Sequence, residues 1–591
     1  MSKHRLSPTP LPIAKRHHGS KPFSERRIVI TFDNALYDEL ILLIFSFLDS
    51  RDLCAVEAIN RNCSRLAGDN HLWRALFVRE FGKARLRGGR GYYGRADGRI
   101  AKRLPSRISP LEDDVLDWKW MYRISSNWRN GRCAIENFRE CENSRVDSSS
   151  LSRVPISLEH LPPRPRWFVL LAGTLTIFAA SECSQRPIIF LRNRSDPPMT
   201  FKCKSQLSNG PISISSMALD QSPSSSRMTS HGPTVSLAAF LSTGEFSIYD
   251  HDPSSAPVAE RRTYIPLHHH RSPVTHAAYH HPLLVTLSHA FTLMIYDLSG
   301  DTIIHTQTLS SFTSHPPTSV VLSAMPLTSS FKLVLAYAVP VYPSHWSVGA
   351  TELIISRSGS VSSSSAIFAD PPVTPLKPGN LVVSRTRSAR AFDVPQGWID
   401  EQKLQQMRVQ WCRKVKRVAD TQTDGKWVVL ASGDTPPPFS TTSRDSSSSS
   451  SQTLETSPST TPSPSTYVSS PSHSSAHLQL YRLHMPSPAS TRPHTHAPRL
   501  TFIRTLHGPS GPVSALALAD GRCVCLGVHG SIWVWDLESG SGAEVEKSSE
   551  SADGGVKMET SSGPSCGTVV FDERRIVSAG IKGIEERRFD I

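Results

Sequence analysis

The sequence predicts a multidomain protein in which a small all-α unit of three helices precedes an all-β propeller of about seven blades, several of them degenerate, with disordered insertions. Three observations predict this organisation. The chain has 591 residues, more than the roughly 250–300 that one hydrophobic core usually holds. Apolar residues recur with a helical period near the N-terminus, and from about residue 166 the pattern changes to short strands separated by turns. Serine- and proline-rich stretches interrupt those strands.

The predicted domain boundaries follow from these changes in composition. They are a disordered basic leader at 1–31, the helical unit at 32–81, a basic Arg/Gly-rich segment with a Trp-rich linker helix at 82–132, a linker at 133–165, and the propeller at 166–591 with a disordered insertion at 434–475. The insertion has three consecutive prolines, six consecutive serines and repeated Ser-Pro or Thr-Pro steps, so it cannot bury a core. Phosphorylation of those steps is one reading, and composition alone is the other.

The net charge of +14 lies mostly near the N-terminus. Residues 1–27 contribute +6 and residues 73–132 contribute +9, so the rest of the chain is nearly neutral. This distribution argues against a nucleic-acid partner for the propeller. The ten cysteines form no C-x-x-C pair and indicate reduced thiols. The most apolar windows are too short to span a membrane, so we expect a location in the cytoplasm, the nucleus or both.

Three short helices are predicted between about Asp33 and Phe81. Asp33 or Asn34 can cap the first, whose apolar residues follow the i, i+4, i+7/i+8 spacing of one helix face. These apolar residues are Leu36, Leu40, Leu43, Ile44 and Phe47. A polar turn at 49–52 separates it from a second helix with Leu53, Val56 and Ile59. The third helix runs from Cys63 toward Leu72-Trp73.

The same stretch resembles an F-box. The string L-x-x-E-L-x-x-x-I-F-S-F-L-x-x-x-D-L-C-x-V begins at Leu36, and R-x-x-x-x-L-A from Arg61 and the pair Leu72-Trp73 follow it. F-boxes usually begin Leu-Pro, whereas this chain has Tyr37 after Leu36. Proline there is a helix-start residue, so its absence weakens the signal for the helix start but leaves the apolar face unchanged. An ordinary helical bundle explains the periodicity but not these offsets together, and a unit of ~45 residues has little core of its own.

The resemblance implies a docking function. F-boxes bind a Skp-type adaptor, which joins a cullin, so it implies the non-catalytic substrate-recognition subunit of an SCF-type ubiquitin ligase, which directs a protein substrate to ubiquitination and proteasomal degradation. The adaptor-binding residues carried over by position are Leu36, Tyr37, Glu39, Leu40, Ile44, Phe45, Leu48, Leu53 and Val56. They cannot all contact the adaptor, because part of this apolar set must form the unit's own core.

The predicted propeller is clearest in four units that end in an aromatic residue and an aspartate. The unit Pro512–Gly540 has three alternating strands and closes on Trp535-Asp536, which is similar to the dipeptide that ends a WD-type blade. The other structural blade-ending dipeptides are Tyr249-Asp250, Tyr296-Asp297 and Phe589-Asp590. Degenerate units are placed near 166–195, 317–357 and 405–482. A closed ring is favoured because an open stack would leave exposed edge strands.

Two further segments bear on the architecture. Trp118–Cys133 predicts a helix with Trp118, Met121, Tyr122 and Ser125 on one face. Its N-W-R-x-G-R string, from Asn127, resembles the segment that joins the F-box to the propeller in F-box/WD-repeat proteins. Trp398–Val418 fits a helical stripe or an alternating strand equally, and the two readings stay open.

No catalytic, metal or cofactor-binding constellation is found in the sequence. The histidines at 268–270 and 280–281 have no Cys or acidic partner at ligand spacing, so we expect no metal and no cofactor. The expected partners are a Skp-type adaptor, a cullin and a protein substrate on the propeller face, phosphorylated or not, without a membrane or nucleic acid. Two alternatives stay open: a non-ligase scaffold, and an RNA-binding protein that uses the R-G-G-R-G-Y-Y-G-R stretch at 87–95.

Overall fold

The computed structural model divides the chain into two compact units, Met1–Leu76 and Phe77–Ile591. It describes residues 32–81, 117–138, 166–193, 197–222, 234–252, 258–267, 272–311, 315–325, 329–341, 344–357, 380–392, 397–433, 477–485, 497–509, 511–545, 567–580 and 583–591. The predicted leader at 1–31, the Arg/Gly/Tyr stretch at 87–95 and the Ser/Pro-rich insertion at 434–475 lie outside these ranges. Within the described ranges, no helix combines the length and the apolar content that crossing a membrane requires.

The first unit consists of short helices. They are α1 (Phe32–Ala35), α2 (Asp38–Phe45), α3 (Ser50–Glu57), α4 (Arg61–Ala67) and the start of α5 (Asn70–Phe81). The Asp49 carboxylate accepts the backbone N–H of Arg51 at 2.8 Å and so caps α3, and the Asn60 side chain caps α4. The predicted start of the first long helix was wrong. Tyr37 is extended and separates α1 from α2, which begins with two acidic residues, as a helix N-terminus favours.

The core of the first unit is small and apolar. Its buried side chains are Ile41, Phe45, Leu53, Cys63, Leu66, Ala67, Leu72, Trp73 and Leu76. The Trp73 indole N–H donates to the carbonyl of Ala67 at 2.8 Å, which satisfies the polar atom of a buried ring. The Leu72-Trp73 pair of the sequence motif therefore completes this core.

In the second unit, one helix precedes the strands in the sequence and another lies between two of the sheets. Helix α6 (Trp118–Asn130) is capped by Asp117 and ends at Gly131, whose φ of 69° is a left-handed C-terminal conformation. The predicted face of α6 is confirmed, since Trp118, Met121, Tyr122 and Ser125 are buried. Helix α7 (Glu401–Trp411) occupies the middle of the ambiguous segment Trp398–Val418, whereas its last residue, Val418, starts a strand.

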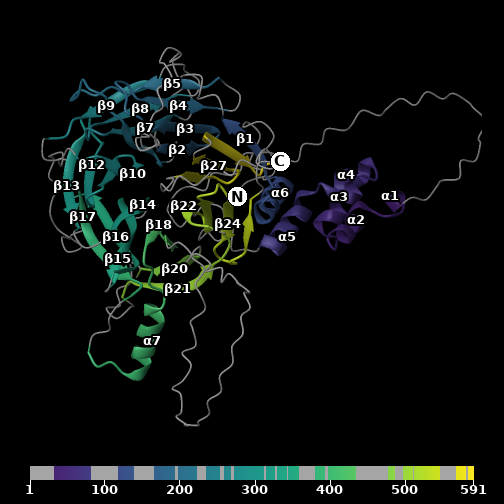
Figure 1. Ribbon diagram of the computed structural model, residues 1–591. Coiled ribbons are helices and arrows are strands. Elements are labelled where there is room, and N and C mark those ends of the chain that lie inside the picture. Colours follow the sequence, from purple (N-terminus) through teal and green to yellow (C-terminus); the bar gives the residue numbers. More distant parts are fainter. Residues whose placement is uncertain are drawn as a thin grey trace, which may run out of the picture. The chain divides into compact units, whose positions relative to one another are not determined.

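In the described part of the chain, the strands of the second unit form seven four-stranded antiparallel sheets, which Figure 1 shows around a ring. The first three blades are β2 (Trp167–Ala172), β3 (Leu175–Ala180), β4 (Ile188–Arg192) and β5 (Met199–Lys202); β6 (Ile214–Leu219), β7 (Val235–Leu241), β8 (Phe246–His251) and β9 (Ala259–Tyr264); and β10 (Val274–His280), β11 (Leu283–Ser288), β12 (Thr292–Asp297) and β13 (Ile304–Ser310). Each blade is a run of strands consecutive in sequence.

The remaining blades follow the same order until the last. They are β14 (His315–Met325), β15 (Ser330–Val341), β16 (His345–Arg357) and β17 (Leu381–Arg390); β18 (Val418–Thr423), β19 (Trp427–Ser432), β20 (Leu478–His484) and β21 (Arg499–Leu506); β22 (Val513–Ala519), β23 (Arg522–Gly527), β24 (Ile532–Asp536) and β25 (Gly542–Glu544); and β26 (Thr568–Phe571), β27 (Arg575–Gly580) and β28 (Gly583–Arg588) together with β1 (Ala134–Phe138).

The ring is closed. The first strand of each blade contacts the first strand of the next, and β26 of the last blade contacts β2 of the first. Apolar side chains of facing sheets pack between neighbouring blades, as between β11 and β15, where Leu283, Val285 and Leu333 are fully buried. The predicted propeller of about seven blades is therefore confirmed, with seven blades.

Strand β1 corrects the predicted start of the propeller at residue 166. It pairs antiparallel with β28, from Ala134 opposite Arg588 to Phe138 opposite Ile584, and supplies the fourth strand of the last blade. The sequence pattern missed it because β1 is a short strand whose partner lies at the other end of the chain. Phe138 also packs against Phe178 of β3, and the Arg192 guanidinium lies 4.0 Å from its ring centroid.

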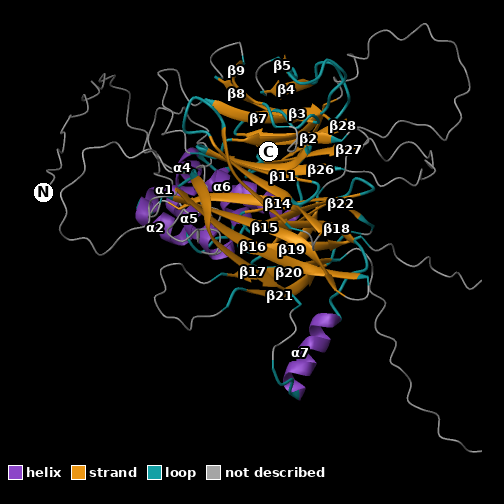
Figure 2. Cartoon of the chain, turned by 90° about the vertical axis from the view of Figure 1, so that its left-hand side faces the viewer, coloured by secondary structure: helices purple, strands orange, loops and turns teal. Residues whose placement is uncertain are grey.

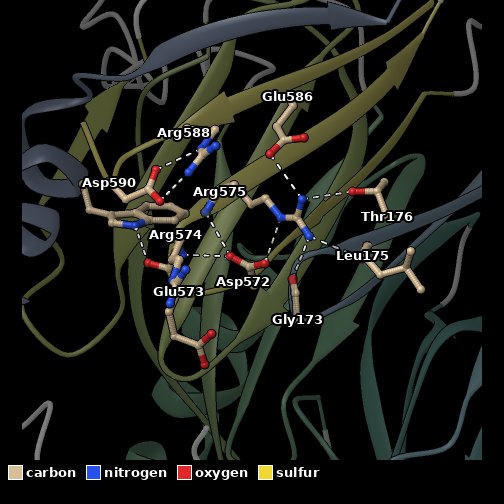
Figure 3. Close-up of polar contacts among 11 residues, drawn as sticks. Gly173, Leu175, Thr176, Asp572, Glu573, Arg574, Arg575, Glu586, Arg588 and Asp590 are labelled. Atoms are coloured by element: carbon tan, nitrogen blue, oxygen red, sulfur yellow. Dashed lines mark hydrogen bonds and ion pairs between the residues drawn. The ribbon is translucent and has the colours of Figure 1, made fainter. Parts of the chain in front are cut away.

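A buried arginine joins the last blade to the first (Figure 3). The Arg575 Nη1 donates to Thr176 Oγ1 at 3.0 Å and to Glu586 Oε1 at 3.2 Å, and its Nη2 donates to the Gly173 carbonyl at 2.8 Å. Its Nε donates to Asp572 Oδ2 at 3.1 Å. One guanidinium thus links a carboxylate pair of the last blade to the turn between β2 and β3.

Candidate functional site

The first unit exposes a stripe of large apolar side chains along α2 and its end. Its members are Tyr37, Leu40, Leu43, Ile44 and Phe47, which are between 42% and 80% exposed. From Leu40 to Phe47 they follow the i, i+3, i+4, i+7 spacing of one helix face. The opposite side of the same helix carries the buried Ile41 and Phe45. An apolar stripe of this kind on a unit with a small core indicates a partner-binding surface.

The structure sorts the nine predicted adaptor-binding residues into three groups. Tyr37, Glu39, Leu40 and Ile44 are exposed; Leu36, Leu48 and Val56 are half-buried; Phe45 and Leu53 are buried. The last two are a correction to the predicted contact set, because they are 4% and 1% exposed and fill the core of the unit itself. The first group lies on the exposed stripe or beside it, and whether these residues touch an adaptor stays a prediction.

Two members of the stripe are not among the nine predicted adaptor-binding residues. Leu43 is 57% exposed and Phe47 is 79% exposed, more than either Leu40 or Ile44. Their spacing in the sequence places both on the apolar face of the helix, but the predicted contact set leaves them out. Their signal was available, since Phe47 lies three residues beyond Ile44 in the same helical period.

Two polar contacts involve the helix that carries the stripe. The Arg65 guanidinium of α4 pairs with the Asp38 carboxylate of α2 at 2.5 Å, and the Ser46 hydroxyl donates to the Leu43 carbonyl at 2.6 Å. Both Asp38 and Arg65 are substantially exposed, so this ion pair between α2 and α4 contributes little stability.

The predicted blade-ending dipeptides have structural positions at the ends of the third strands. Their aromatic members Tyr249, Tyr296, Trp535 and Phe589 are all buried. Two of the aspartates accept hydrogen bonds from the turn that follows the strand. Asp536 accepts the N–H groups of Glu538 and Ser539, and Asp297 accepts the N–H of Ser299. Asp250 accepts the Ser236 hydroxyl at 2.5 Å, and Asp590 pairs with Arg588 at 2.5 Å.

A metal site requires several His, Cys, Asp or Glu side chains close together. Across the described ranges, His, Cys, Asp and Glu side chains do not gather in groups of three or more that could hold a metal ion. His280 and His281 lie at the end of β10, and residues 268–270 are outside the described ranges.

Comparison with known proteins identifies the first unit by family. The family model for F-box-like domains matches residues 38–79. A curated F-box protein of Saccharomyces cerevisiae is 30% identical over 121 residues, which are 19% of this chain and 19% of that protein. The matched region thus spans about a fifth of the length of this curated relative. Among solved structures, the β-propeller domain of Myceliophteria thermophila Cps50 (Swd1) aligns with 72% of this chain and 99% of its own, at 8% identity and a TM-score of 0.35.

Proposed function

Because the chain has an F-box-like domain followed by a seven-bladed propeller, an arrangement consistent with an F-box/WD-repeat protein, we propose that it is the substrate-recognition subunit of an SCF-type ubiquitin ligase. The observation that carries the proposal is the exposed apolar stripe on α2, within the residues that match the F-box family. In this role the stripe binds a Skp-type adaptor, which joins the chain to a cullin.

The propeller then captures a protein substrate, and its loops supply the specificity. This division of labour requires no catalytic group in the chain. The receptor holds a substrate lysine near a conjugating enzyme that carries ubiquitin, and so raises the effective concentration of the lysine at that enzyme. The proposed outcome is ubiquitination and degradation of the substrate in the cytoplasm or nucleus.

The adaptor contact is tested by a double substitution on the stripe. Replacing Leu40 and Ile44 with Asp places two carboxylates where apolar side chains would be desolvated, so adaptor affinity is expected to fall by about 100-fold or more. The measurement is co-purification of the Skp-type adaptor with the full-length chain. Both positions are already solvent-exposed, so thermal unfolding is expected to change little.

A matched control separates this contact from a general effect of added charge. Leu267 of the second unit is 63% exposed, and Leu267→Asp makes the same chemical change away from the stripe. We expect the control to retain the adaptor. Undiminished adaptor binding by the Leu40/Ile44 double variant refutes the assignment of the interface to α2.

The scaffold alternative is tested with the same preparations. A ligase receptor brings the cullin along with the adaptor, and its substrate accumulates when the F-box-like domain is deleted. Adaptor binding without cullin, and without accumulation of any bound protein, favours a non-ligase scaffold. RNA binding would instead be lost on removal of residues 87–95 and would weaken steeply with salt.

A further inference from the structure

One face of the blade formed by β18, β19, β20 and β21 carries three basic side chains close together. Arg482 and His484 are two residues apart on β20, so they lie on the same face of the sheet. Arg499, at the start of β21, is directly opposite His484 in the strand register and therefore shares that face. Figures 1 and 2 show β20 and β21 side by side, and β21 is the terminal strand of its sheet.

The Arg482 side chain is positioned without the use of its N–H groups. Its guanidinium carbon, Cζ, lies 5.2 Å from the centroid of the Trp427 ring. Trp427 is opposite Arg482 in the register of β19 and β20, and it is only 3% exposed. A cation over an aromatic face is attracted by the electrons of the ring, so this contact takes up none of the five N–H donors of the guanidinium. Arg482 is thus held against a fixed ring with its donors available.

The acidic side chains nearby do not neutralise these cations. Within the described ranges, neither Arg482 nor Arg499 has a hydrogen-bond or ion-pair acceptor at its guanidinium. The Asp424 carboxylate accepts backbone N–H groups of its own turn at 2.7 and 2.9 Å. Glu538 of the next blade pairs with Lys426. The sequence of the segment that joins β20 to β21 contains no acid.

The positive charge acts on His484, which lies beside both arginines. Burial lowers the pKa of His484, and the positive charges of Arg499 and Arg482 lower it further. Arg482 is half-buried, so its charge is partly removed from water. Charged groups that are partly removed from water are ordinarily paired with an opposite charge. Two neighbouring guanidinium groups without such a pair have the charge and the donors to bind an anion.

We propose that Arg482, His484 and Arg499 form a binding site for a phosphate monoester. Two guanidinium groups supply two positive charges and a set of N–H donors, which match the three acceptor oxygens and the nearly double negative charge of this group. A carboxylate has two oxygens and one charge, so it would leave one arginine uncompensated. The His484 ring donates a further hydrogen bond. The site belongs to the propeller and does not rest on the proposed ligase function.

The test is a ³¹P NMR titration of the full-length chain with O-phosphoserine and, separately, with inorganic phosphate. The wild-type chain is expected to bind with a Kd on the order of 1 mM. Arg482→Gln and Arg499→Gln each remove one cation with its donors, so each variant is expected to bind about tenfold more weakly. Tighter binding of O-phosphoserine would identify a phosphorylated side chain as the source of the phosphate, and tighter binding of inorganic phosphate would identify a free anion.

Two further variants separate the site from a general effect of charge and from misfolding. Arg390 is an exposed arginine on β17 of the preceding blade, and Arg390→Gln makes the same chemical change there and should leave the Kd unchanged. Arg499 is exposed, so its variants are expected to stay folded. Arg499→Lys keeps the charge and loses the fork of donors, so its affinity is expected to lie between those of the wild type and Arg499→Gln.

Three outcomes would overturn the proposal. The first is a wild-type chain that binds neither probe at concentrations up to about 20 mM. The second is undiminished binding by both Arg482→Gln and Arg499→Gln, because the phosphate then binds elsewhere. The third is an equal loss of affinity in Arg390→Gln, because the phosphate is then attracted by the general positive charge of the chain and not by a formed site.

Discussion

At the scale of single residues, the environment of His276 changes its protonation. It lies on β10, the first strand of its blade, and it is partly buried there. Burial lowers the pKa of His276 to about 4, and the positive charge of Arg166 acts in the same direction. The imidazole is therefore neutral in the folded protein at pH values where an unfolded histidine would already be charged.

This shift predicts a loss of stability in mild acid. Because the folded-state pKa lies below the unfolded value of about 6.5, the folded state is at full stability above pH 6.5 and loses it as the pH falls toward 4. Relative to His276→Gln, we expect the wild-type chain to lose about 1–3 kcal/mol more unfolding free energy between pH 7 and pH 4. Denaturant unfolding of both proteins at pH 7 and at pH 4 measures this difference in unfolding free energy. Equal losses in the two proteins would show that His276 does not titrate in this way.

Gly131 is a second informative residue, because its backbone conformation and its surroundings both require glycine. Its φ of 69° favours glycine, and a Cβ there would lie 2.1 Å from the Glu544 carbonyl oxygen. Gly131→Ala is expected to lower the unfolding free energy by about 2–4 kcal/mol, from both strain and collision with backbone. Gly173 has a similar φ of 63° with no atom within 4 Å of a Cβ, so Gly173→Ala should cost only about 1–2 kcal/mol. Equal losses of unfolding free energy for the two variants would mean that the backbone at Glu544 moves away from the added methyl group at little cost.

At the scale of elements, α6 is packed on the last blades by several independent contacts. The Trp128 ring stacks on Phe589 with centroids 3.9 Å apart, and its indole N–H donates to the Glu573 carbonyl at 3.0 Å. The Asn127 side chain donates to the Phe589 carbonyl at 2.8 Å, and the Arg522 guanidinium lies over the Trp128 ring. The N-W-R-x-G-R string thus supplies a stacking residue, a hydrogen-bonding residue and a terminating glycine in one turn.

Truncating the stacked tryptophan tests how much this packing contributes. Trp128→Ala removes a buried ring and leaves a cavity beside Phe589, so we expect a loss of about 3–5 kcal/mol of unfolding free energy. Circular dichroism and denaturant unfolding of the full-length chain measure it. A loss below about 1 kcal/mol would show that α6 contributes little to the stability of the propeller.

The elements also show what sequence patterns could and could not predict. Helix α2 was predictable because its apolar residues recur with a helical period. Its partner-facing side was not, because the run Ile41–Phe45 is apolar on every side and periodicity cannot assign Phe45 to the core and Leu43 to the surface. The blade ending at Trp535-Asp536 was predictable because its strands and turns are contiguous. Strand β1 was not, because its pairing with β28 leaves no local signal.

At the scale of the whole second unit, ring closure depends on the junction between the last blade and the first. Arg575 is the polar centre of that junction, and it is buried with carboxylates of the last blade on one side and backbone carbonyls of the first on the other. Removing it leaves Glu586, itself buried, without this cation. The cost of an unpaired buried charge exceeds the net worth of the pair.

Arg575→Leu is accordingly expected to lower the unfolding free energy by about 3–5 kcal/mol. Arg575→Lys keeps the charge and loses the fork that reaches both blades, so an intermediate loss is expected. Thermal unfolding of the three proteins orders them. If Arg575→Leu were as stable as the wild type, the junction would be held by apolar packing alone.

The pairing of β1 with β28 has a consequence for synthesis on the ribosome. Residues 134–138 leave the ribosome early, whereas their partner strand at 583–588 is made among the last in this sequence. At about 5–20 residues per second, the interval is on the order of a minute. During this interval β1 lacks its partner strand β28, so its unpaired backbone groups can pair with strands of other nascent chains. Slowed elongation should therefore increase aggregation of this protein, and chaperones that shield strand edges should reduce it.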